Sequence, residues 1–464
     1  MLFNSFEFLI FFPVVTILYF LIPHKWRWLH LLIASCIFYM AFIPVYILIL
    51  VFTIVIDYFA GIYIEKAEGR RRRFFLVLSI VANLGTLAVF KYYNFFIDNV
   101  NELLGLSEGD QLPFLNIILP IGLSFHTFQA MSYTIEVYKR NQKAERHFGI
   151  YSLYVMFYPQ LVAGPIERPQ NLLWQLREKH KFEINRVYEG LKLMLWGLFK
   201  KVVIADRLAL YVNQVYAEPG SWSGSNLILA TIFFSIQIYC DFSGYSDMAI
   251  GSAKVMGIKL MVNFNRPYFA RNIQEFWKRW HISLSTWFRD YLYIPIGGNR
   301  GSRARMYLNV AIVFIISGLW HGANWTFVIW GTIHAILVIG YMLYRELVPR
   351  KKSNWFGDLV SILLTFILVT VAWVFFRASG VQEAMFIFSK MANPDFGNFQ
   401  FGSTAAIIAV SMIAILFINE RFQNVEQTTL NNKPYLDIAF NAFILFAIIT
   451  LGVFQKMSFI YFQF

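Results

Sequence analysis

The sequence predicts an all-α polytopic membrane protein with about 10–12 transmembrane or re-entrant helices. Hydrophobic residues occupy 58% of its 464 positions and charged residues only 14%, and its mean hydropathy is +0.53. The apolar residues gather in runs of about 20, the length that an α-helix needs to cross a bilayer. This composition excludes a soluble globular, disordered, collagen-like or coiled-coil chain, because each of those needs a more polar or repetitive sequence.

The net charge of +13 arises from 40 Lys and Arg residues against 27 Asp and Glu residues. The basic residues stand between the apolar runs, which favours the positive-inside rule over a nucleic-acid partner. Both cysteines, Cys36 and Cys240, lie within apolar runs, so neither a disulfide framework nor a cysteine-based metal site is expected.

The first apolar run, residues 2–22, has neither a basic segment before it nor a small-residue cleavage site. We therefore expect a retained helix rather than a signal peptide, with Lys25 and Arg27 after its cytoplasmic end. Helices over about 30–43 and 44–63 then cross outward and back, and bring the run of four arginines at 70–73 to the cytoplasm.

The next span, about 74–97, leads to a loop with acidic and no basic residues, as expected on the outer face: Asp98, Glu102, Glu108 and Asp110. The returning run 113–138 contains Pro120 and Gly122, which predicts a kinked or broken helix before a basic landing at 139–146. The apolar stretch 148–164 has 17 residues, which is short for a crossing and predicts a re-entrant pair.

The second half of the chain repeats this alternation, with one exception. After Lys200 and Lys201, helices are expected at about 202–216 and 226–250. Residues 251–305 carry ten Lys and Arg together with several Trp and Phe, which predicts a cytoplasmic-side interfacial or re-entrant segment within a single integral-membrane domain covering 1–464. Further spans are expected near 306–320, 322–344, 357–376, 404–419 and 437–455, with a basic landing at 345–352.

Ionisable groups in apolar surroundings are costly and therefore mark candidate functional sites. The sequence contains nine of them: Asp57, His126, Glu136, Asp206, Asp241, Asp247, His281, His321 and His334. Glu136, Asp241 and Asp247 fit an ion path, but pairing with arginines or with hydroxyls such as that of Ser243 is the favoured interpretation.

His321 is the strongest of these candidates. It follows Arg305 by 16 residues, about 24 Å of helix, so its ring is expected deep in the membrane. A neutral imidazole there is suited to accept a proton as a general base. The alternative is a structural histidine bonded to a backbone carbonyl or to Asn324.

His281 lies in a basic, aromatic stretch. Helical spacing places Trp277, His281, Leu284 and Phe288 on one face, which predicts an amphipathic helix at the inner leaflet. A catalytic site and a lipid-facing interfacial helix explain this pattern equally well.

Other site types find no support. Ser246 lacks the second glycine of a nucleophile elbow, and the chain has no HExxH, Walker A or helix-opening GxGxxG motif. Two histidines without a third ligand make a weak metal case, so no metal and no bound cofactor are predicted. The sequence shows no internal repeat, which counts against a transporter built from inverted repeats.

Three segments together resemble a known family. They are DFSGYSDMAIG at 241–251, WKRWHISLSTWF at 277–288 and GLWHGANW at 318–325, with support from 163–169, 200–206 and 459–464. They resemble membrane-bound O-acyltransferases, and within these the bacterial branch that includes the membrane subunit of alginate O-acetylation systems.

The resemblance implies many tilted helices around a central tunnel, in a multi-pass protein of the bacterial cytoplasmic (inner) membrane. It implies that His321 is the catalytic histidine and that His281 occupies a second family position, filled by Asn or His. The remaining motif residues become substrate or tunnel candidates: Trp320, Asn324, Trp325, Trp277, Trp280, Ser283, Asp241 and Tyr245.

The implied reaction moves acetyl from a cytosolic thioester, with acetyl-CoA as co-substrate, to a hydroxyl. In the polysaccharide branch, an extracytoplasmic partner protein then completes the transfer onto a polymer such as alginate. His321 would take the hydroxyl proton, while His281 would orient the donor or donate a hydrogen bond to the developing oxyanion. An acyl-histidine intermediate is an open alternative. A conduit without acyl chemistry, coupled through Asp241, Asp247 or Glu136, and a lipid or protein acyltransferase of the same family are the alternative functions.

Overall fold

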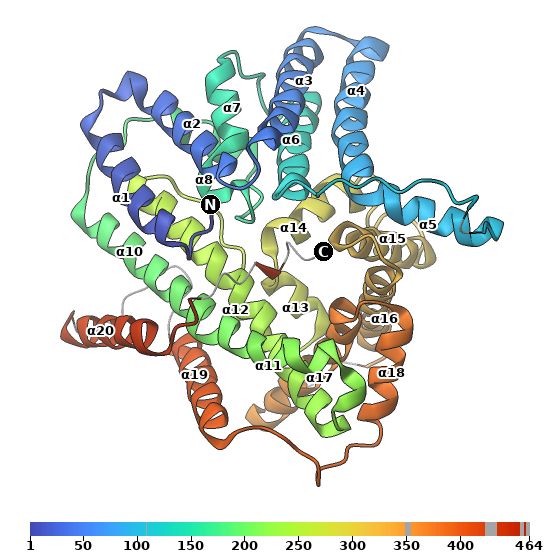
Figure 1. Ribbon diagram of the computed structural model, residues 1–464. Coiled ribbons are helices and arrows are strands. Elements are labelled where there is room, and N and C mark those ends of the chain that lie inside the picture. The colour runs from blue at the N-terminus through green and yellow to red at the C-terminus, as the bar shows by residue number, and fades with distance from the viewer. Residues whose placement is uncertain (108, 349–353, 423–433, 455–458, 461–464) are drawn as a thin grey trace. The chain divides into compact units, whose positions relative to one another are not determined.

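The computed structural model describes residues 1–107, 109–348, 354–422, 434–454 and 459–460. Within these ranges every regular element is a helix (Figure 1). Glu108, the basic cluster at 350–352 and the family-like residues 461–464 lie outside the described residues. The all-α polytopic prediction is confirmed.

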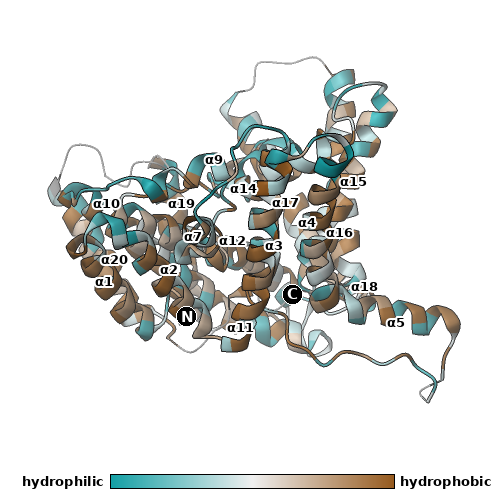
Figure 2. Cartoon of the chain, turned by 90° about the horizontal axis from the view of Figure 1, so that it is seen from above, coloured by the Kyte–Doolittle hydropathy of each residue, from teal (hydrophilic) through white to brown (hydrophobic). Residues whose placement is uncertain are grey.

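Seven helical segments in the described chain are long and apolar enough to cross a membrane. They are Pro44–Lys66, Gly69–Leu104, Gly224–Met256, Arg303–His321, Trp325–Leu347, Trp355–Arg377 and Thr404–Phe422. Helices α1 (Phe6–Leu21) and α20 (Pro434–Leu451) are apolar but shorter. Hydrophobic residues run along helices such as α3 and α5 (Figure 2), and many of their large side chains are exposed, as lipid-facing residues are.

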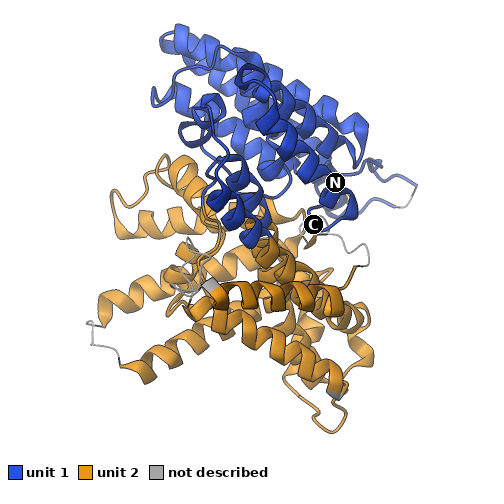
Figure 3. Cartoon of the chain, turned by 90° about the vertical axis from the view of Figure 1, so that its left-hand side faces the viewer, with its two compact units in different colours: residues 1–194, 248–261 blue, residues 195–247, 262–464 orange. Residues whose placement is uncertain are grey.

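The described residues fall into two compact units (Figure 3). Unit 1 comprises residues 1–194 and 248–261, and unit 2 comprises residues 195–247 and 262–464. Helices α10 (Ile184–Phe199) and α12 (Gly224–Met256) contribute residues to both. The single-domain organisation stays a prediction.

Unit 1 is built around α3 (Ile47–Lys66), α4 (Gly69–Leu87) and α6 (Leu123–Tyr138), which pack on one another. Gly61 on α3 lets the Tyr133 ring of α6 come close, because a Cβ on residue 61 would lie 2.6 Å from that ring. Besides α1 and the first part of α10, this unit contains α2 (His24–Met40), α5 (Tyr93–Leu104), α7 (Phe148–Met156), α8 (Tyr158–Leu161) and α9 (Pro169–Leu172).

Three local expectations in unit 1 are refined by the structure. The predicted break near Pro120 is confirmed, and α6 begins only after Gly122, whose φ of 78° is the left-handed conformation that glycine tolerates. The stretch 148–164 forms two helices, α7 and α8, each too short to span. Asp98 and Glu102 lie on α5, which continues α4 through a π-helical turn at Ala88–Tyr92, rather than in a loop.

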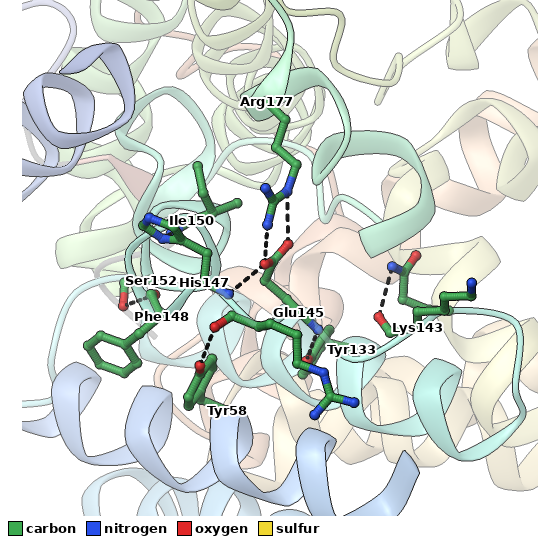
Figure 4. A network of polar contacts seen from close by, with 11 residues as sticks. Tyr58, Tyr133, Lys143, Glu145, His147, Phe148, Ile150, Ser152 and Arg177 are labelled. Atoms are coloured by element: carbon green, nitrogen blue, oxygen red, sulfur yellow. Dashed lines mark hydrogen bonds and ion pairs between the residues drawn. The ribbon is translucent and has the colours of Figure 1, made fainter. Parts of the chain in front are cut away.

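The basic segment 139–146, which follows α6, is held in place by a network of hydrogen bonds and an ion pair (Figure 4). The Glu145 carboxylate pairs with Arg177 and accepts the His147 N–H at 2.7 Å. The Glu145 N–H donates to the Tyr133 hydroxyl at 2.8 Å, and His147 Nδ1 caps α7 by accepting the Ile150 N–H at 3.2 Å. These contacts order the segment that joins α6 to α7.

Unit 2 contains α11 (Asp206–Ala217), α13 (Ile273–Arg279), α14 (Ile282–Phe288), α15 (Arg303–His321), α16 (Trp325–Leu347), α17 (Trp355–Arg377), α18 (Val381–Met391) and α19 (Ser403–Phe422). Helices α15 and α16 form a close antiparallel pair, because a glycine of each helix lies against the backbone of the other. A Cβ on Gly318 would lie 2.2 Å from the Phe327 carbonyl oxygen, and one on Gly331 would lie 2.3 Å from that of Phe314. The sequence did not predict α18.

Candidate active site

The segment around His281 is not one amphipathic helix. Helix α13 ends at Arg279, α14 begins at Ile282, and His281 between them has φ 45° and ψ 55°. Only two other described non-glycine residues, Arg140 and Arg266, have positive φ. The prediction of a continuous helical face is wrong, because a left-handed residue interrupts a right-handed helix.

A hydrogen-bonded framework holds this strained backbone. The Ile282 N–H donates to the Asn263 carbonyl oxygen at 2.9 Å, and Ser283 Oγ donates to Asn263 Oδ1 at 2.9 Å. Asn263 Nδ2 in turn donates to Ser246 Oγ at 3.3 Å. A left-handed non-glycine residue costs about 1–3 kcal/mol and persists where its surroundings over-determine it, a situation common at active sites. The bonds to Ile282 and Ser283 therefore hold the backbone that directly follows His281.

His281 is fully buried, which contradicts the lipid-facing alternative. Its ring centroid lies 4.7 Å from that of Phe242 and 6.4 Å from that of Trp320. Burial lowers the pKa of His281 to about 3, so the ring is neutral near pH 7. This part of the predicted interfacial or re-entrant segment 251–305 therefore lies in the protein interior.

His321 is the last residue of α15 and is almost fully buried. Its ring centroid lies 4.8 Å from Trp320, 5.1 Å from Trp330 and 5.4 Å from Phe376. Trp320 therefore neighbours both histidines, and the structure brings His281 and His321 into one aromatic cluster of unit 2.

The other motif residues take different places. Trp280 is buried against Trp373, with ring centroids 5.2 Å apart. Asn324 caps α16, since its Oδ1 accepts the Thr326 N–H at 2.9 Å and its Nδ2 donates to a backbone carbonyl. Trp325 is 53% exposed, so it does not line this cluster.

Sequence reasoning did not place His334 at the site, but it lies in the same cluster. It follows Trp330 by one helical turn on α16 and is fully buried. Its ring centroid is 4.7 Å from Trp330 and 5.0 Å from Trp277. Trp330 is thus a neighbour of both His321 and His334. The four-residue spacing of Trp330 and His334 within an apolar helix indicates that the two rings share a helix face, and it could have placed His334 near the site.

Asp241 and Asp247 are paired with lysines, which supports the structural interpretation although the partners are not arginines. Lys201 Nζ lies 2.7 Å from Asp241 Oδ1 and 2.8 Å from Asp206 Oδ1, and Lys200 Nζ lies 2.7 Å from Asp247 Oδ2. Both lysines are buried in the π-helical turn Lys200–Ala205. The sequence pattern predicts a helix boundary at these lysines but does not indicate that they pair with the aspartates.

The second oxygen of Asp241 joins a distant part of the chain to the cluster. Asp241 Oδ2 accepts the Ile460 N–H at 2.8 Å. The preceding Phe459 packs on Tyr245, with ring centroids 5.0 Å apart, and on Phe242 at 5.7 Å. Phe242 in turn contacts His281, so Phe459 packs against a direct neighbour of that histidine.

The other intramembrane candidates belong to unit 1 and have partners there. Asp57 accepts hydrogen bonds from Ser79 and Asn83, His126 bonds Thr53, and Glu136 accepts from Asn141 and Gln170. Across the described residues, no three His, Cys, Asp or Glu side chains are grouped to hold a metal ion.

The family model for membrane-bound O-acyltransferases matches residues 112–381, which include both site histidines. The chain belongs to the membrane-bound O-acyltransferase family. It is therefore a multi-pass membrane enzyme that transfers acyl groups to oxygen. The resemblance noted in the sequence is confirmed.

Curated relatives agree with this assignment. The chain is 40% identical to a probable alginate O-acetylase of Pseudomonas aeruginosa, over 86% of this chain and 76% of the relative. It is 38% identical to a peptidoglycan O-acetyltransferase of Helicobacter pylori, over 80% and 74%. A teichoic acid D-alanyltransferase of Bacillus subtilis is 28% identical, over 56% and 69%. The roles of individual site residues of this O-acyltransferase stay predictions.

Proposed function

We propose that this O-acyltransferase moves an acetyl group from a cytosolic thioester, with acetyl-CoA as the expected donor, to a hydroxyl acceptor, and that the acetyl group ends on an exopolysaccharide. The observation that carries the proposal is the buried aromatic cluster that holds His321 at the end of α15 and His281 beside the same tryptophan. The named relatives include alginate and peptidoglycan O-acetylating proteins, which supports a polymer acceptor.

In this mechanism His321 is the general base. The hydroxyl oxygen attacks the thioester carbonyl carbon while its proton passes to the His321 imidazole. The tetrahedral intermediate then collapses, the carbon–sulfur bond breaks, and the imidazolium returns the proton to the leaving thiolate. The first step needs a neutral imidazole, because only that form has a nitrogen lone pair to accept the proton.

His281 is the second proposed catalytic group. As a neutral imidazole it carries one N–H, which is suited to orient the donor carbonyl or to donate a hydrogen bond to the developing oxyanion. Its strained backbone, held by Asn263, fixes the direction of the ring before the substrate arrives. An acyl-histidine intermediate on His321 requires the same geometry and is the alternative route.

Two features complete the proposal. The enzyme is placed in the bacterial cytoplasmic membrane, with the basic landings facing the donor side. An extracytoplasmic partner protein receives the acetyl group and transfers it to the polymer, as the family branch implies. A conduit without acyl chemistry does not fit an O-acyltransferase family. The relatives named for alginate, peptidoglycan and teichoic acid support a polymer acceptor over a lipid or a protein.

The test is ester-linked acetate on the surface polysaccharide of cells that carry the wild type, His321→Ala or His281→Ala, with membrane levels of each protein measured. His24→Ala, which removes an imidazole from unit 1, is the matched control. We expect acetate to disappear with His321→Ala, to fall with His281→Ala and to persist with the control. Full acetylation by inserted His321→Ala protein would remove the basis of the proposed mechanism.

A further inference from the structure

A cavity of about 610 Å³ in unit 2 lies apart from the histidines' aromatic cluster. It is formed by the start of α17, the end of α19, the segment that precedes α13 and the last residue of α13. Four arginines line it, together with an apolar wall that includes Trp355 and Leu359: Arg266, Arg271, Arg279 and Arg421. Arg279 belongs to the motif segment 277–288, whereas the other three arginines lie outside the segments that carry the family resemblance and have no part in the proposed reaction.

The positive charge of the cavity is only partly balanced. Arg271 pairs with Asp358 at 3.2 Å, and Arg279 pairs with Glu275 at 2.6 Å. The carboxylate of Glu420, the other acidic lining residue, accepts a hydrogen bond from Tyr239. Four arginines against Asp358, Glu420 and the Glu275 partner of Arg279 leave one positive charge in excess, which favours an anionic ligand.

Arg266 is held toward the cavity at a conformational cost. Its backbone is left-handed, with φ 49° and ψ 59°, directly before Pro267, which normally forces the preceding residue into an extended conformation. The Asn265 N–H bond to the Arg279 carbonyl at 2.9 Å stabilises this turn. The Arg266 guanidinium donates to the Glu420 carbonyl oxygen at 3.2 Å. Strain of this kind persists where the surrounding structure over-determines it, a situation common at ligand-binding sites.

The apolar wall indicates where the ligand comes from. Trp355 is 78% exposed and Leu359 43%, and one turn further along α17 Leu363 is also exposed. In a bilayer this face contacts lipid tails, and a tryptophan at the start of a span is typical of the membrane interface. The positive-inside rule places this end of α17 and α19 at the cytoplasmic surface.

We propose that this cavity binds the phosphate headgroup of an anionic phospholipid of the cytoplasmic leaflet, with its acyl chains along the apolar face of α17. Arginine is suited to phosphate because its planar guanidinium donates two parallel hydrogen bonds. A soluble phosphate ligand, such as the nucleotide part of coenzyme A, shares the headgroup chemistry but has no use for the lipid-facing wall. Basic pockets between helices at the cytoplasmic side are a recognised form of lipid site.

The test uses the full-length protein in nanodiscs of phosphatidylcholine, to which phosphatidylglycerol is added and counted on the protein by native mass spectrometry. The test variant is Arg266→Gln with Arg421→Gln. The control is Arg71→Gln with Arg73→Gln, which removes two exposed arginines from the predicted cytoplasmic end of α4. We expect roughly thirtyfold weaker phosphatidylglycerol binding in the test variant and unchanged binding in the control.

Because Arg266 also stabilises its turn, Arg421→Gln alone is measured in parallel. Arg421 is exposed at the end of α19, and its single substitution is expected to weaken binding about fivefold with no change in thermal unfolding in phosphatidylcholine. Wild-type protein that shows no preference for phosphatidylglycerol over phosphatidylcholine would overturn the proposal. Displacement of the bound lipid by coenzyme A would overturn it too, and would assign the cavity to a soluble phosphate ligand.

Discussion

Gly318 connects the packing of α15 and α16 to the position of His321, and its replacement by alanine is the most direct test of the site geometry. A Cβ at this position would lie 2.2 Å from the Phe327 carbonyl oxygen, whereas ordinary contacts begin near 3.4 Å. The obstacle is backbone rather than a movable side chain, so the two helices have to separate by about 1 Å. His321 lies three residues further along the same helix and moves with it.

The expected loss follows from that displacement. Overpacking of this size costs about 1–3 kcal/mol of stability. A displacement of about 1 Å in a catalytic group lowers the rate about a hundredfold. We therefore expect Gly318→Ala protein that still inserts into the membrane, unfolds at a lower temperature and acetylates polysaccharide at about one hundredth of the wild-type rate.

The matched control is Gly340→Ala on α16, where a Cβ meets nothing within 4 Å. It changes the same residue type in the same helix pair and is expected to be neutral or slightly stabilising, because alanine favours the helix more than glycine does. Thermal unfolding and acetate transfer are measured for both variants. Gly318→Ala protein with wild-type stability and activity would refute the close approach of α15 and α16 on which the site depends.

Three further predictions concern buried groups of unit 2. Lys201→Met leaves the Asp241 and Asp206 carboxylates without their shared cation, and is expected to cost about 3–5 kcal/mol in detergent unfolding, whereas the same change at exposed Lys278 has little effect. The pKa of His281 is about 3 in the folded protein and 6.5 for the free side chain, so the unfolded state binds a proton that the folded state does not. We therefore expect the stability of the protein to decline as the pH falls from about 6.5 toward 3. Equal acid sensitivity of the wild type and His281→Asn would contradict this. His334→Leu replaces a fully buried ring, neither of whose nitrogens has a hydrogen-bond partner among the described residues, and is expected to preserve or raise thermal stability; a large destabilisation would show that the ring has a polar partner.

Much of the architecture was predictable from residue patterns. In lipid the backbone has to satisfy its own hydrogen bonds, so each long apolar run becomes a helix whatever its neighbours are. The run 44–63 accordingly lies in the helical segment Pro44–Lys66, most of which is α3, and the run 357–376 lies in α17. Pro120 and Gly122 predicted the interruption before α6, since neither residue favours the interior of a helix.

The site was predictable only in part. His321 was found because an ionisable group at the end of an apolar run is costly, and its neighbours Trp320 and Trp330 are close in sequence. Trp325 is equally close in sequence but lies on the exposed side of α16. The helical spacing around His281 continued through the residue at which the structure breaks the helix, so periodicity predicted a face that does not exist.

By itself, the sequence determined the helical membrane class, the approximate spans and, through its motifs, the acyltransferase family. It did so because those properties depend on local composition and on residues adjacent in the chain. Only the tertiary structure decided that Lys201 neutralises Asp241, that Asn263 holds His281 in a left-handed conformation and that Trp320 neighbours both histidines. Each of these contacts joins residues from separate helices or loops, and their energies arise only when burial removes water from the groups that meet.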